Sequence, residues 1–524
     1  MTMYLSNSMK LFWTAAAVVS IIACKPKQEV KYEPVVATAT GFEKHRPDVH
    51  FTPASGWMND PNGMFFLDGE YHLFYQYYPD STIWGPMHWG HAVSSDLVHW
   101  ERLPIALYPD SLGYIFSGSA VVDENNTSGF GSPGKPAVVA IFTNHDPKGE
   151  REGKDDFQTQ GIAYSTDRGR TWKKFEGNPV LNNPHLKDFR DPKVSWNDDA
   201  SQWLMTLAVK DHIEFYGSPD LKAWSKLGEF GRNEGDHGGV WECPDLFKLK
   251  DASGKSKYVL LVSINPGAPN GGSGTQYFIG NFDGKRFMSD TPGKNAGWVD
   301  FGPDDYAGVT FANVPAVDGR RIFIGWMSNW LYAQSVPTEK WRSATTIPRE
   351  LTLERSAKSY LLKSVPVKEL NKLVRYSKNV NAMTSSDTVR LVTDQDSIAI
   401  PLVIRGSVHK TNFALELSDS RGEKLIAGFD ATKNQYYIDR SHTPTGFHKD
   451  FNAAMIAPRN ANDEVIEFIA VIDVSSIELF FDKGATSMTA TVFPNHVFRE
   501  IKLYGRSTKV KTGPIELQAL KPIW

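Results

Sequence analysis

The sequence predicts an all-β protein in which a five-bladed β-propeller is followed by a C-terminal β-sandwich. The first observation is composition: the 524 residues include 42 Gly and 31 Pro, and 12% are aromatic, a mixture typical of many short strands joined by turns. The second is that no long stretch between residues 51 and 354 has apolar residues at helical spacing. The third is repetition, since short segments recur at intervals typical of radial β architectures.

The N-terminal part of the chain is expected to direct the protein to a membrane. An apolar stretch over residues 11–23 is too short for a comfortable bilayer span, and its end, Ile21-Ile22-Ala23-Cys24, resembles a bacterial lipobox. We predict a lipoprotein signal peptide over residues 1–24, lipidation of Cys24 and a polar tether over residues 25–49. The expected product is a membrane-anchored bacterial lipoprotein, periplasmic or at the cell surface; an ordinary signal peptide is the alternative.

The propeller is predicted over residues 50–360 from two sets of recurring segments. One set consists of Asp-led turns that follow an apolar strand and end in an aromatic residue, as expected in the outer hairpin of a blade: residues 94–100, 165–172, 218–224 and, in degenerate form, 281–287. The other set consists of expected inner-strand starts, about 50 to 70 residues apart: Asn59-Asp60-Pro61, Ser117-Gly118-Ser119, Arg190-Asp191-Pro192, Glu242-Cys243-Pro244 and Asn313-Val314-Pro315. Inner strands line the axis of a propeller, so these starts should converge on one funnel.

The sandwich is predicted over residues 370–524, where the strands become longer and alternate between apolar and polar residues, as at 413–417 and 465–472. This part of the sequence contains no cluster of acidic residues with histidine. Its expected role is therefore to pack against the propeller, with residues 365–370 crossing from one domain to the other.

Charge and motif content exclude several function classes. The 57 Lys+Arg and 60 Asp+Glu give a net charge of −3, which provides no basic field for nucleic acid. The two cysteines, Cys24 and Cys243, differ too much in setting to form a disulfide framework. There is no phosphate-binding loop, dinucleotide fingerprint or serine-nucleophile motif. His88 and His91 lack the partners of a zinc motif, so we interpret them as structural and predict no metal or cofactor.

Three of the five expected strand starts carry an acid: Asp60, Asp191 and Glu242. Their convergence would raise at least one pKa by mutual repulsion, which is how a site keeps one acid protonated beside an ionised one. Glycoside hydrolysis needs that arrangement. Each acid alone could be a turn residue, but three acids at equivalent places of a repeat favour a catalytic function.

The segment Trp57-Met58-Asn59-Asp60-Pro61-Asn62-Gly63 closely resembles a motif of glycoside hydrolase family 32, the invertase, inulinase and levanase family of β-fructofuranosidases. Further family-like segments follow in the family's order: Tyr75-Gln76-Tyr77, His88-Trp89-Gly90-His91, Phe116-Ser117-Gly118-Ser119, Phe189-Arg190-Asp191-Pro192, Trp241-Glu242-Cys243-Pro244-Asp245, Gly325-Trp326-Met327, Trp341-Arg342-Ser343-Ala344 and Ile438-Asp439-Arg440-Ser441. The resemblance covers nearly everything after the tether.

The resemblance implies a retaining hydrolase that releases fructose from levan, inulin or sucrose, with exo action expected. It assigns Asp60 as nucleophile, Glu242 as general acid and base, and Asp191 as a transition-state stabiliser that binds fructose hydroxyls. It also implies that the pocket for the terminal sugar, subsite −1, is lined by Asn59, Gln76, Trp84, Phe116, Ser117, Arg190 and Trp326.

One position departs from the family pattern. The resemblance implies that Asp304, in Gly302-Pro303-Asp304, is a ligand of a sugar hydroxyl, but Asp305 stands where the family often has an aromatic residue. The sequence therefore leaves the roles of Asp304 and Asp305 open.

Two other functions stay open. Arabinosidases and xylosidases also place three axial acids on a five-bladed propeller, although residues 57–63 and 241–245 argue against them. A non-catalytic glycan-binding lipoprotein is the other, against which the presence of all three acids argues. The sequence predicts neither the preference between β-2,1 and β-2,6 linkages nor an oligomeric state.

Overall fold

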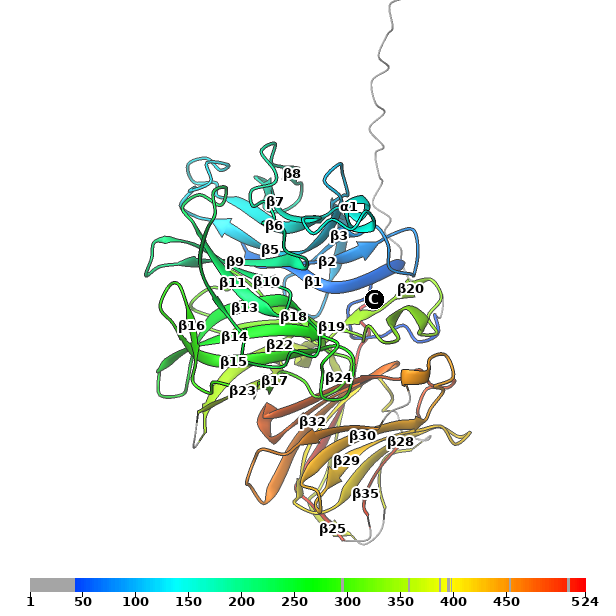
Figure 1. The fold of residues 1–524 in the computed structure, drawn as a ribbon. Helices are drawn as coiled ribbons and strands as arrows, with labels where there is room; N and C mark the ends of the chain where they lie inside the picture. The colour runs from blue at the N-terminus through cyan, green and yellow to red at the C-terminus, as the bar shows by residue number, and fades with distance from the viewer. Residues whose placement is uncertain are drawn as a thin grey trace, which may run out of the picture. The chain divides into compact units, whose positions relative to one another are not determined.

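The computed structural model describes residues 43–524, apart from 294–295, 357–358, 386–387, 394–395, 397, 452–453 and 507–508 (Figure 1). The predicted signal peptide, its lipidation site Cys24 and most of the predicted tether lie outside the described residues. Among the described residues, the structure contains no helix that is both long and apolar enough to cross a membrane.

Five sheets, each with four antiparallel strands in chain order, form the propeller, which confirms the predicted fold (Figure 1). The first two blades are β1 (Gly56–Leu67), β2 (Glu70–Tyr78), β3 (His88–Ser94) and β4 (Glu101–Leu107), then β5 (Tyr114–Asp123), β6 (Ala137–His145), β7 (Gln158–Ser165) and β8 (Lys173–Lys174). The third is β9 (Phe189–Asn197), β10 (Gln202–Val209), β11 (His212–Ser218) and β12 (Ser225–Phe230). The fourth is β13 (Val240–Lys250), β14 (Ser256–Asn265), β15 (Gly274–Phe282) and β16 (Phe287–Ser289), and the fifth is β18 (Tyr306–Thr310), β19 (Arg321–Met327), β22 (Arg349–Arg355) and β23 (Tyr360–Pro366).

The inner strands β1, β5, β9, β13 and β18 form a closed ring, because each contacts the next and β18 contacts β1. Short strands extend three of the blades: β17 (Gly297–Trp298) in the fourth, β21 (Ala344–Thr345) in the fifth and β20 (Trp341–Arg342) in the first. β20 follows the second strand of the fifth blade, yet it pairs in parallel with β1. The last blade thereby closes the ring on the first.

The Asp-led turns join the third and fourth strands of their blades, as predicted. Asp96, Asp167 and Asp220 each accept a backbone N–H three or four residues further on at 2.9 Å. The residue after each of these acids has φ between 62° and 69°. The carboxylate replaces the missing backbone partner in this tight turn, so the repeated sequence encodes the outer edge of each blade.

The expected start of the fifth inner strand is wrong. Asn313 lies in the connection after β18, with φ of 57°, and its side chain donates to the Phe66 carbonyl at 3.0 Å. The true inner strand begins at Tyr306 and contains no proline, so a search for an Asn-x-Pro or acid-Pro pattern passes over it. The outer strand β23 also extends beyond the expected end at residue 360, to Pro366.

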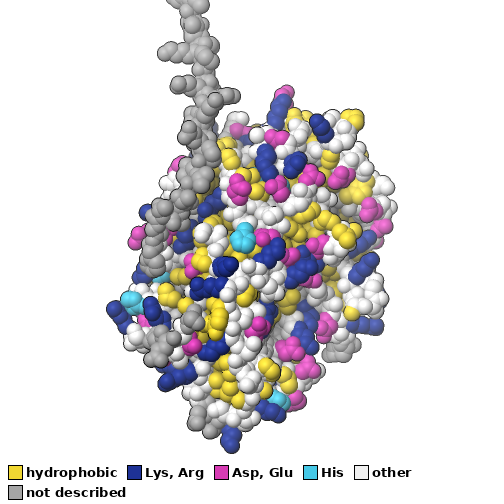
Figure 2. Space-filling view, turned by 180° about the vertical axis from the view of Figure 1, so that it is seen from behind, with side chains coloured by type: hydrophobic (Ala, Val, Ile, Leu, Met, Phe, Trp, Pro, Cys, Tyr) yellow, Lys and Arg dark blue, Asp and Glu magenta, His cyan; other side chains and the backbone are white. Residues whose placement is uncertain are grey.

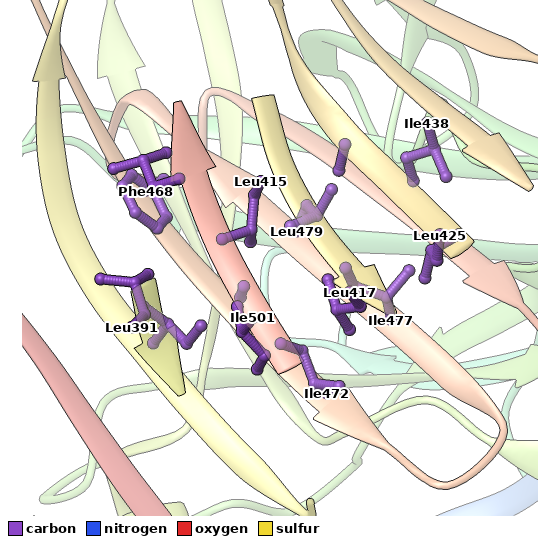
Figure 3. Packing of buried hydrophobic residues seen from close by; sticks show 14 of the residues in the cluster. Leu391, Leu415, Leu417, Leu425, Ile438, Phe468, Ile472, Ile477, Leu479 and Ile501 are labelled. Atoms are coloured by element: carbon purple, nitrogen blue, oxygen red, sulfur yellow. The ribbon is translucent and has the colours of Figure 1, made fainter. Parts of the chain in front are cut away.

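The C-terminal sandwich consists of two sheets. One sheet contains β24 (Val374–Val380), β25 (Met383–Ser385), β27 (Leu402–His409), β32 (Val465–Asp473), β33 (Ser476–Phe481), β34 (Thr486–Thr491), β36 (Val510–Thr512) and β37 (Ile515–Leu520). The other contains β26 (Val389–Val392), β28 (Phe413–Ser418), β29 (Lys424–Asp430), β30 (Gln435–His442), β31 (Met455–Pro458) and β35 (Glu500–Gly505). Leucine and isoleucine side chains from both sheets meet in a buried core, including Leu415 and Leu417 of β28 and Ile477 and Leu479 of β33 (Figure 3).

The helical elements among the described residues are short: α1 (Pro147–Arg151), which follows β6, and 3₁₀ segments at Ala333–Ser335, Lys368–Leu373, Lys449–Phe451 and Asp482–Gly484. On the face shown in Figure 2, acidic and basic side chains are interspersed with small apolar patches. That mixture matches the nearly balanced composition of the chain.

The sandwich packs against the propeller through buried ionic side chains, which we call the interface cluster: His50, Asp300, Asp305, Arg349, Asp473 and Glu478. The His50 ring nitrogens lie 2.7 Å from Asp473 Oδ2 and 2.8 Å from Glu478 Oε1. Arg349 Nη1 donates to Asp300 and Asp305, each at 2.9 Å, and Arg349 Nε donates to Glu478 at 3.1 Å. The side chains of this cluster are almost completely buried. The two domains are therefore joined by paired charges as well as by apolar contacts.

Candidate active site

A register irregularity interrupts each of the five inner strands near one end of the axis. In β1 it falls between Met58 and Pro61, in β5 between Ile115 and Gly118, in β13 between Glu242 and Asp245 and in β18 between Tyr306 and Val309. In β9 the pairing shifts between Arg190 and Lys193. Bulges bend a strand and re-aim its side chains, so the motifs found in the sequence mark the places where the inner strands turn side chains into the funnel.

Cys243 links the carboxylates of Asp60 and Asp191. Its backbone N–H donates to Asp191 Oδ2 at 3.0 Å, and its sulfur lies 3.6 Å from both Asp191 Oδ2 and Asp60 Oδ2. Burial, with the charges of the nearby acids, raises the pKa of the Cys243 thiol well above its usual range. The thiol therefore stays protonated and packs between the two acids.

Asp60 lies on β1 with one carboxylate oxygen held on each side. Oδ1 accepts a hydrogen bond from the Asn59 amide at 2.9 Å, and Oδ2 accepts one from the Ser117 hydroxyl at 2.7 Å. Burial and the charge of Glu242 raise the pKa of Asp60, while these two hydrogen bonds oppose the rise. The carboxylate is thus fixed in orientation and remains partly exposed to the cavity.

Asp191 is the more buried of the two aspartates, with 5% of its surface exposed. Its backbone has φ of 64°, and its N–H donates to the Thr143 hydroxyl at 3.0 Å. Burial raises the pKa of Asp191 to about 7, helped by the charges of Glu242 and Asp60 and opposed by Arg190. The expected upward shift of at least one acid in the trio is therefore present in the structure.

Both oxygens of the Glu242 carboxylate have donors. Oε1 accepts from Arg190 Nε at 3.1 Å and from Arg190 Nη2 at 2.9 Å. Oε2 accepts from the Tyr306 hydroxyl. Arg190 is in turn held by Asp188, whose Oδ1 lies 2.7 Å from Arg190 Nη1. Glu242 is therefore oriented by a guanidinium on one side and a phenol on the other.

One cavity of about 260 Å³ brings the three acids together with most of the predicted binding residues. These are Asn59, Gln76, Trp84, Phe116, Ser117 and Arg190. Sequence reasoning missed six further lining residues: His145, Glu150, Phe157, Gln158, Asp188 and Trp330. Asp188 stands two residues before Arg190, so an acid this close to the predicted arginine was a usable signal. His145 and Gln158 are the end residues of β6 and β7, and Glu150 lies in α1. Phe157 and Trp330 lie in connections, and no local pattern marks any of these five residues.

The missed residues form much of one wall of the cavity. The His145 ring stacks on Phe116 with centroids 4.1 Å apart, and its Nε2 lies 3.1 Å from Glu150 Oε2. Trp84 meets Phe116 edge-on at 6.0 Å. Aromatic faces beside carboxylate, amide and guanidinium groups suit a ligand that has apolar faces and many hydroxyls.

Trp326 is an exception among the predicted lining residues. It is fully buried, outside the cavity lining, and packs against Trp57, Tyr306 and Trp330. Trp330, four positions further on, packs against Trp326 with ring centroids 4.9 Å apart and lines the cavity together with other aromatic residues. The prediction that Trp326 lines the pocket is corrected to a supporting position.

Asp304 does not reach the cavity either. Its carboxylate is fully buried, pairs with Arg440 at 3.1 Å and accepts a hydrogen bond from the Tyr332 hydroxyl at 2.8 Å. The interpretation of Asp304 as a ligand of a sugar hydroxyl is therefore wrong for this chain, because the side chain is turned toward the sandwich. Its neighbour Asp305 belongs to the interface cluster.

The two histidines of the His88-x-x-His91 segment bind separate partners. His88 Nδ1 lies 2.9 Å from the Pro86 carbonyl, and His91 Nε2 lies 3.1 Å from His72 Nδ1.

A larger cavity of about 470 Å³ lies further along the inner strands, around Lys193 and Asp245. These two side chains pair at 3.2 Å, so the buried acid of this second cavity is matched by a buried lysine.

Sequence models of the "Glycosyl hydrolases family 32 N-terminal domain" and "Glycosyl hydrolases family 32 C terminal" match residues 50–364 and 367–519. The chain belongs to glycoside hydrolase family 32. The predicted family and the predicted glycosidase class are thereby confirmed, and the pentosidase alternative is set aside.

This family 32 chain is similar to several characterised proteins. It is 44% identical to a levanase of Bacillus subtilis (strain 168) over 492 residues, which cover 92% of the chain and 71% of that relative. It is 38% identical to an extracellular exo-inulinase of Aspergillus awamori over 488 residues, covering 86% of the chain and 90% of the relative. The names of both relatives refer to fructans, levan and inulin, which are among the substrates predicted from the sequence.

Solved structures share the fold of this family 32 chain. The exo-inulinase of Aspergillus awamori superposes with a TM-score of 0.83 at 34% identity, covering 92% of the chain and all of that structure. A β-fructofuranosidase of Schwanniomyces occidentalis complexed with fructosyl-erythritol gives 0.82 at 34% identity, covering 91% and 98%.

Proposed function

We propose that this family 32 enzyme removes terminal fructose from levan, inulin or sucrose by a retaining mechanism in which Asp60, Asp191 and Glu242 act together. The observation that carries this proposal is the convergence of the three acids on one cavity, each held by its own donors. The levanase and exo-inulinase relatives support fructose release from fructans.

In the first step, Asp60 attacks the anomeric carbon of the fructosyl unit while Glu242 donates a proton to the departing oxygen. Asn59 and Ser117 hold the attacking carboxylate, and Arg190 and Tyr306 hold the acid. The bond from carbon to the leaving oxygen breaks as the ester to Asp60 forms. A covalent fructosyl-enzyme and a free leaving sugar or alcohol result.

In the second step, Glu242, now ionised, takes a proton from water as the water oxygen attacks the same carbon. The ester to Asp60 breaks, which restores the carboxylate and releases fructose with its original anomeric configuration. Asp191 accepts hydrogen bonds from ring hydroxyls that strengthen as positive charge develops on the sugar. Its exclusion from solvent makes that contact stronger than it would be in water.

Exo action agrees with the size of the cavity. At about 260 Å³ it is smaller than the roughly 300–1,000 Å³ typical of sites for drug-sized ligands. This space suits one sugar ring rather than a stretch of polymer. The terminal fructose would therefore enter first, with the remainder of the chain outside.

Product analysis tests this function. The enzyme and its Glu242→Gln variant are incubated separately with sucrose, inulin, levan and pentosans, and the products are separated at early times. Fructose alone from the polymers supports exo action. The variant should lose about 10²–10⁴-fold in kcat. Oligomers at early times would contradict exo action, and arabinose or xylose from pentosans with no fructose would overturn the proposal.

We also propose that Cys24 carries the lipid that anchors the enzyme to a bacterial membrane, on the periplasmic side or at the cell surface. What supports this proposal is the lipobox-like Ile21-Ile22-Ala23-Cys24 at the end of a short apolar stretch. A lipoprotein carries more than one acyl chain, which is what stable anchoring requires. A Cys24→Ala variant should move to the soluble fraction with unchanged kcat on sucrose, and its retention in washed membranes would contradict the anchor.

A further inference from the structure

Residues 300–305, which precede the fifth inner strand, lie along the sandwich. We call them the docking segment. The Phe301 N–H donates to the Ser487 carbonyl at 2.8 Å, and the Asp304 N–H donates to the Thr489 carbonyl at 3.2 Å. A side chain at Gly302 would meet the Thr489 carbonyl oxygen at 2.0 Å. Only glycine permits this approach, so the docking segment pairs with β34 almost as an additional strand.

The acids of the docking segment reinforce this pairing. The Asp300 carboxylate accepts the Thr489 N–H at 2.8 Å, and Asp304 accepts the Thr491 N–H at 2.8 Å. Asp304 also pairs with Arg440 on β30. These contacts are buried, so the docking segment is held to the sandwich by charge-assisted hydrogen bonds away from water.

Asp305, the last residue of the docking segment, is also connected to the sandwich, through Arg349. Its Oδ2 accepts from Arg349 Nη1 at 2.9 Å, and Arg349 Nε donates to Glu478 of β33 at 3.1 Å. Its Oδ1 has no hydrogen-bond partner among the described residues and lies against Gly325, where a Cβ would be 1.9 Å away. Asp305 is therefore wedged between the guanidinium and β19.

Tyr306 is the next residue, and it faces the active site. It is 1% exposed, packs edge-on against Trp326 at 6.3 Å and donates its hydroxyl hydrogen to Glu242 Oε2. Its backbone pairs with Trp326 just before the register of β18 shifts. One peptide bond thus separates a carboxylate fixed by the sandwich from a phenol that touches the proposed general acid.

We propose that Tyr306 is a positioning residue for the Glu242 carboxyl, and that Arg349 and Asp305 hold it in place on behalf of the sandwich. The inference deepens the proposed function, since it rests on Glu242 being the acid that protonates the leaving oxygen. The C-terminal domain would then contribute to proton transfer without providing a group that touches the substrate.

The physical reason is that proton transfer tolerates only a small displacement of the carboxyl group that donates the proton. A misplacement of about 1 Å can cost about 10²-fold in rate. Arg190 and Tyr306 are the two groups that hold the Glu242 oxygens. Loss of Tyr306 leaves the carboxyl fixed from one side only, and loss of the Asp305 contact frees the backbone that carries the phenol.

The test compares two leaving groups. Sucrose has a poor leaving group that needs the proton from Glu242, whereas 4-nitrophenyl β-fructofuranoside has a good one that needs it little. Values of kcat/KM are measured because they report the first bond cleavage with both substrates. For Tyr306→Phe and Asp305→Asn we expect kcat/KM on sucrose to fall about 10- to 100-fold, with a fall of about threefold or less on the aryl substrate.

A double variant separates positioning from general loosening. If Asp305 acts through Tyr306, then Asp305→Asn should cost little further kcat/KM on sucrose in the Tyr306→Phe background. The alkaline limb of the pH profile of Tyr306→Phe should also move to higher pH, because the carboxylate form of Glu242 loses a donor. Equal losses on both substrates, or multiplying losses in the double variant, would overturn the inference.

Two controls complete the design. Asp482→Asn breaks another buried pair of the sandwich, with Arg459 at 3.0 Å, and should lower Tm while leaving the ratio of the two kcat/KM values unchanged. Glu242→Gln should itself show the preference for the aryl substrate. If it does not, the proposed role of Glu242 fails; if it does and Tyr306→Phe does not, only the positioning inference fails.

Discussion

The catalytic cavity and the interface cluster both gather carboxylates, and they treat them in opposite ways. The cavity holds Asp60, Asp191 and Glu242 with Arg190 as the cation that contacts them, and part of this site is open to solvent. The cluster holds four acids with two cations and is almost completely buried. A group of acids therefore does not by itself indicate an active site. What distinguishes the active site is that its acids are accessible from solvent and have fewer cations beside them.

The pKa shifts follow this difference. In the cavity, burial and mutual repulsion raise the pKa of both Asp60 and Asp191. In the cluster, burial alone would raise the pKa of Asp473 and Glu478, yet the hydrogen bonds and charges of His50 and Arg349 lower it. The pKa of the other two acids of the cluster, Asp300 and Asp305, is raised, because burial outweighs the opposing charge of Arg349. The cavity therefore raises the pKa of both of its aspartates, whereas the cluster lowers the pKa of two of its four acids by pairing them with cations.

The largest expected effect is a loss of activity without a loss of stability, caused by a substitution in the catalytic cavity. Asp60→Asn should lower kcat on sucrose by about 10⁴-fold or more, since the nucleophile is removed. Its Tm should stay close to that of the wild type or rise, because an acid whose pKa is raised by burial costs stability when ionised. Kinetics and calorimetry on the same preparation check both parts. More than a tenth of wild-type kcat would contradict the role of Asp60.

Arg349→Met should act most strongly on stability, and it should also lower kcat/KM on sucrose about 10- to 100-fold, as Asp305→Asn does, because the same contact with Asp305 is lost. Removing one partner from a buried ion-pair network typically costs about 3–5 kcal/mol, because the remaining charges stay buried without compensation. Asp300, Asp305 and Glu478 would all lose a donor. Urea denaturation measures the free energy of unfolding. A loss below about 1 kcal/mol would show that the cluster does not hold the domains together.

The interface cluster should also set a pH dependence of stability. Burial alone would lower the pKa of His50, but the hydrogen bonds and charges of Asp473 and Glu478 raise it to about 9. The folded-state pKa lies above the unfolded value of 6.5, so this contribution is fully present below pH 6.5 and is lost as pH rises toward about 9. The expected loss is about 3 kcal/mol.

The comparison with His50→Gln isolates that contribution. The free energy of unfolding of the wild type should fall more steeply between pH 6.5 and 9 than that of the variant. Parallel curves over this range would show that His50 is not charged in the folded protein.

The smallest effect concerns an acid on the edge of the cavity. Glu150 lines it but is 52% exposed and contacts His145. Glu150→Gln should change the free energy of unfolding by no more than about 0.5 kcal/mol and leave kcat on sucrose within about twofold. A larger loss in kcat would show that Glu150 takes part in catalysis and does not merely line the edge of the cavity.

The sequence predicted the site better than the interface, for a physical reason. Asp60, Asp191 and Glu242 each stand one or two positions before a proline in an inner strand with a register shift. A local motif therefore indicates both the residue and the direction of its side chain. The contacts of His50 are with Asp473 and Glu478, more than 400 positions away. No pattern in the sequence near His50 indicates a contact with residues so far along the chain.

Two misplacements have different origins. Tyr306 was missed because the fifth inner strand offers a phenol where three of the others offer an acid. Asp304 was assigned to the cavity from its motif, although the docking segment turns its side chain toward Arg440. For Asp304 a contact with the sandwich, which the propeller repeat does not encode, decides where the side chain points.

The distance along the chain between His50 and its partner has a consequence for biosynthesis. His50 cannot be buried until Asp473, 423 residues later, has left the ribosome. At about 5–20 residues per second this delay lasts roughly 20 to 85 s. During that interval the segment around His50 lacks Asp473 and Glu478, so the N-terminal end of the propeller takes up its final contacts only after the last domain has been made.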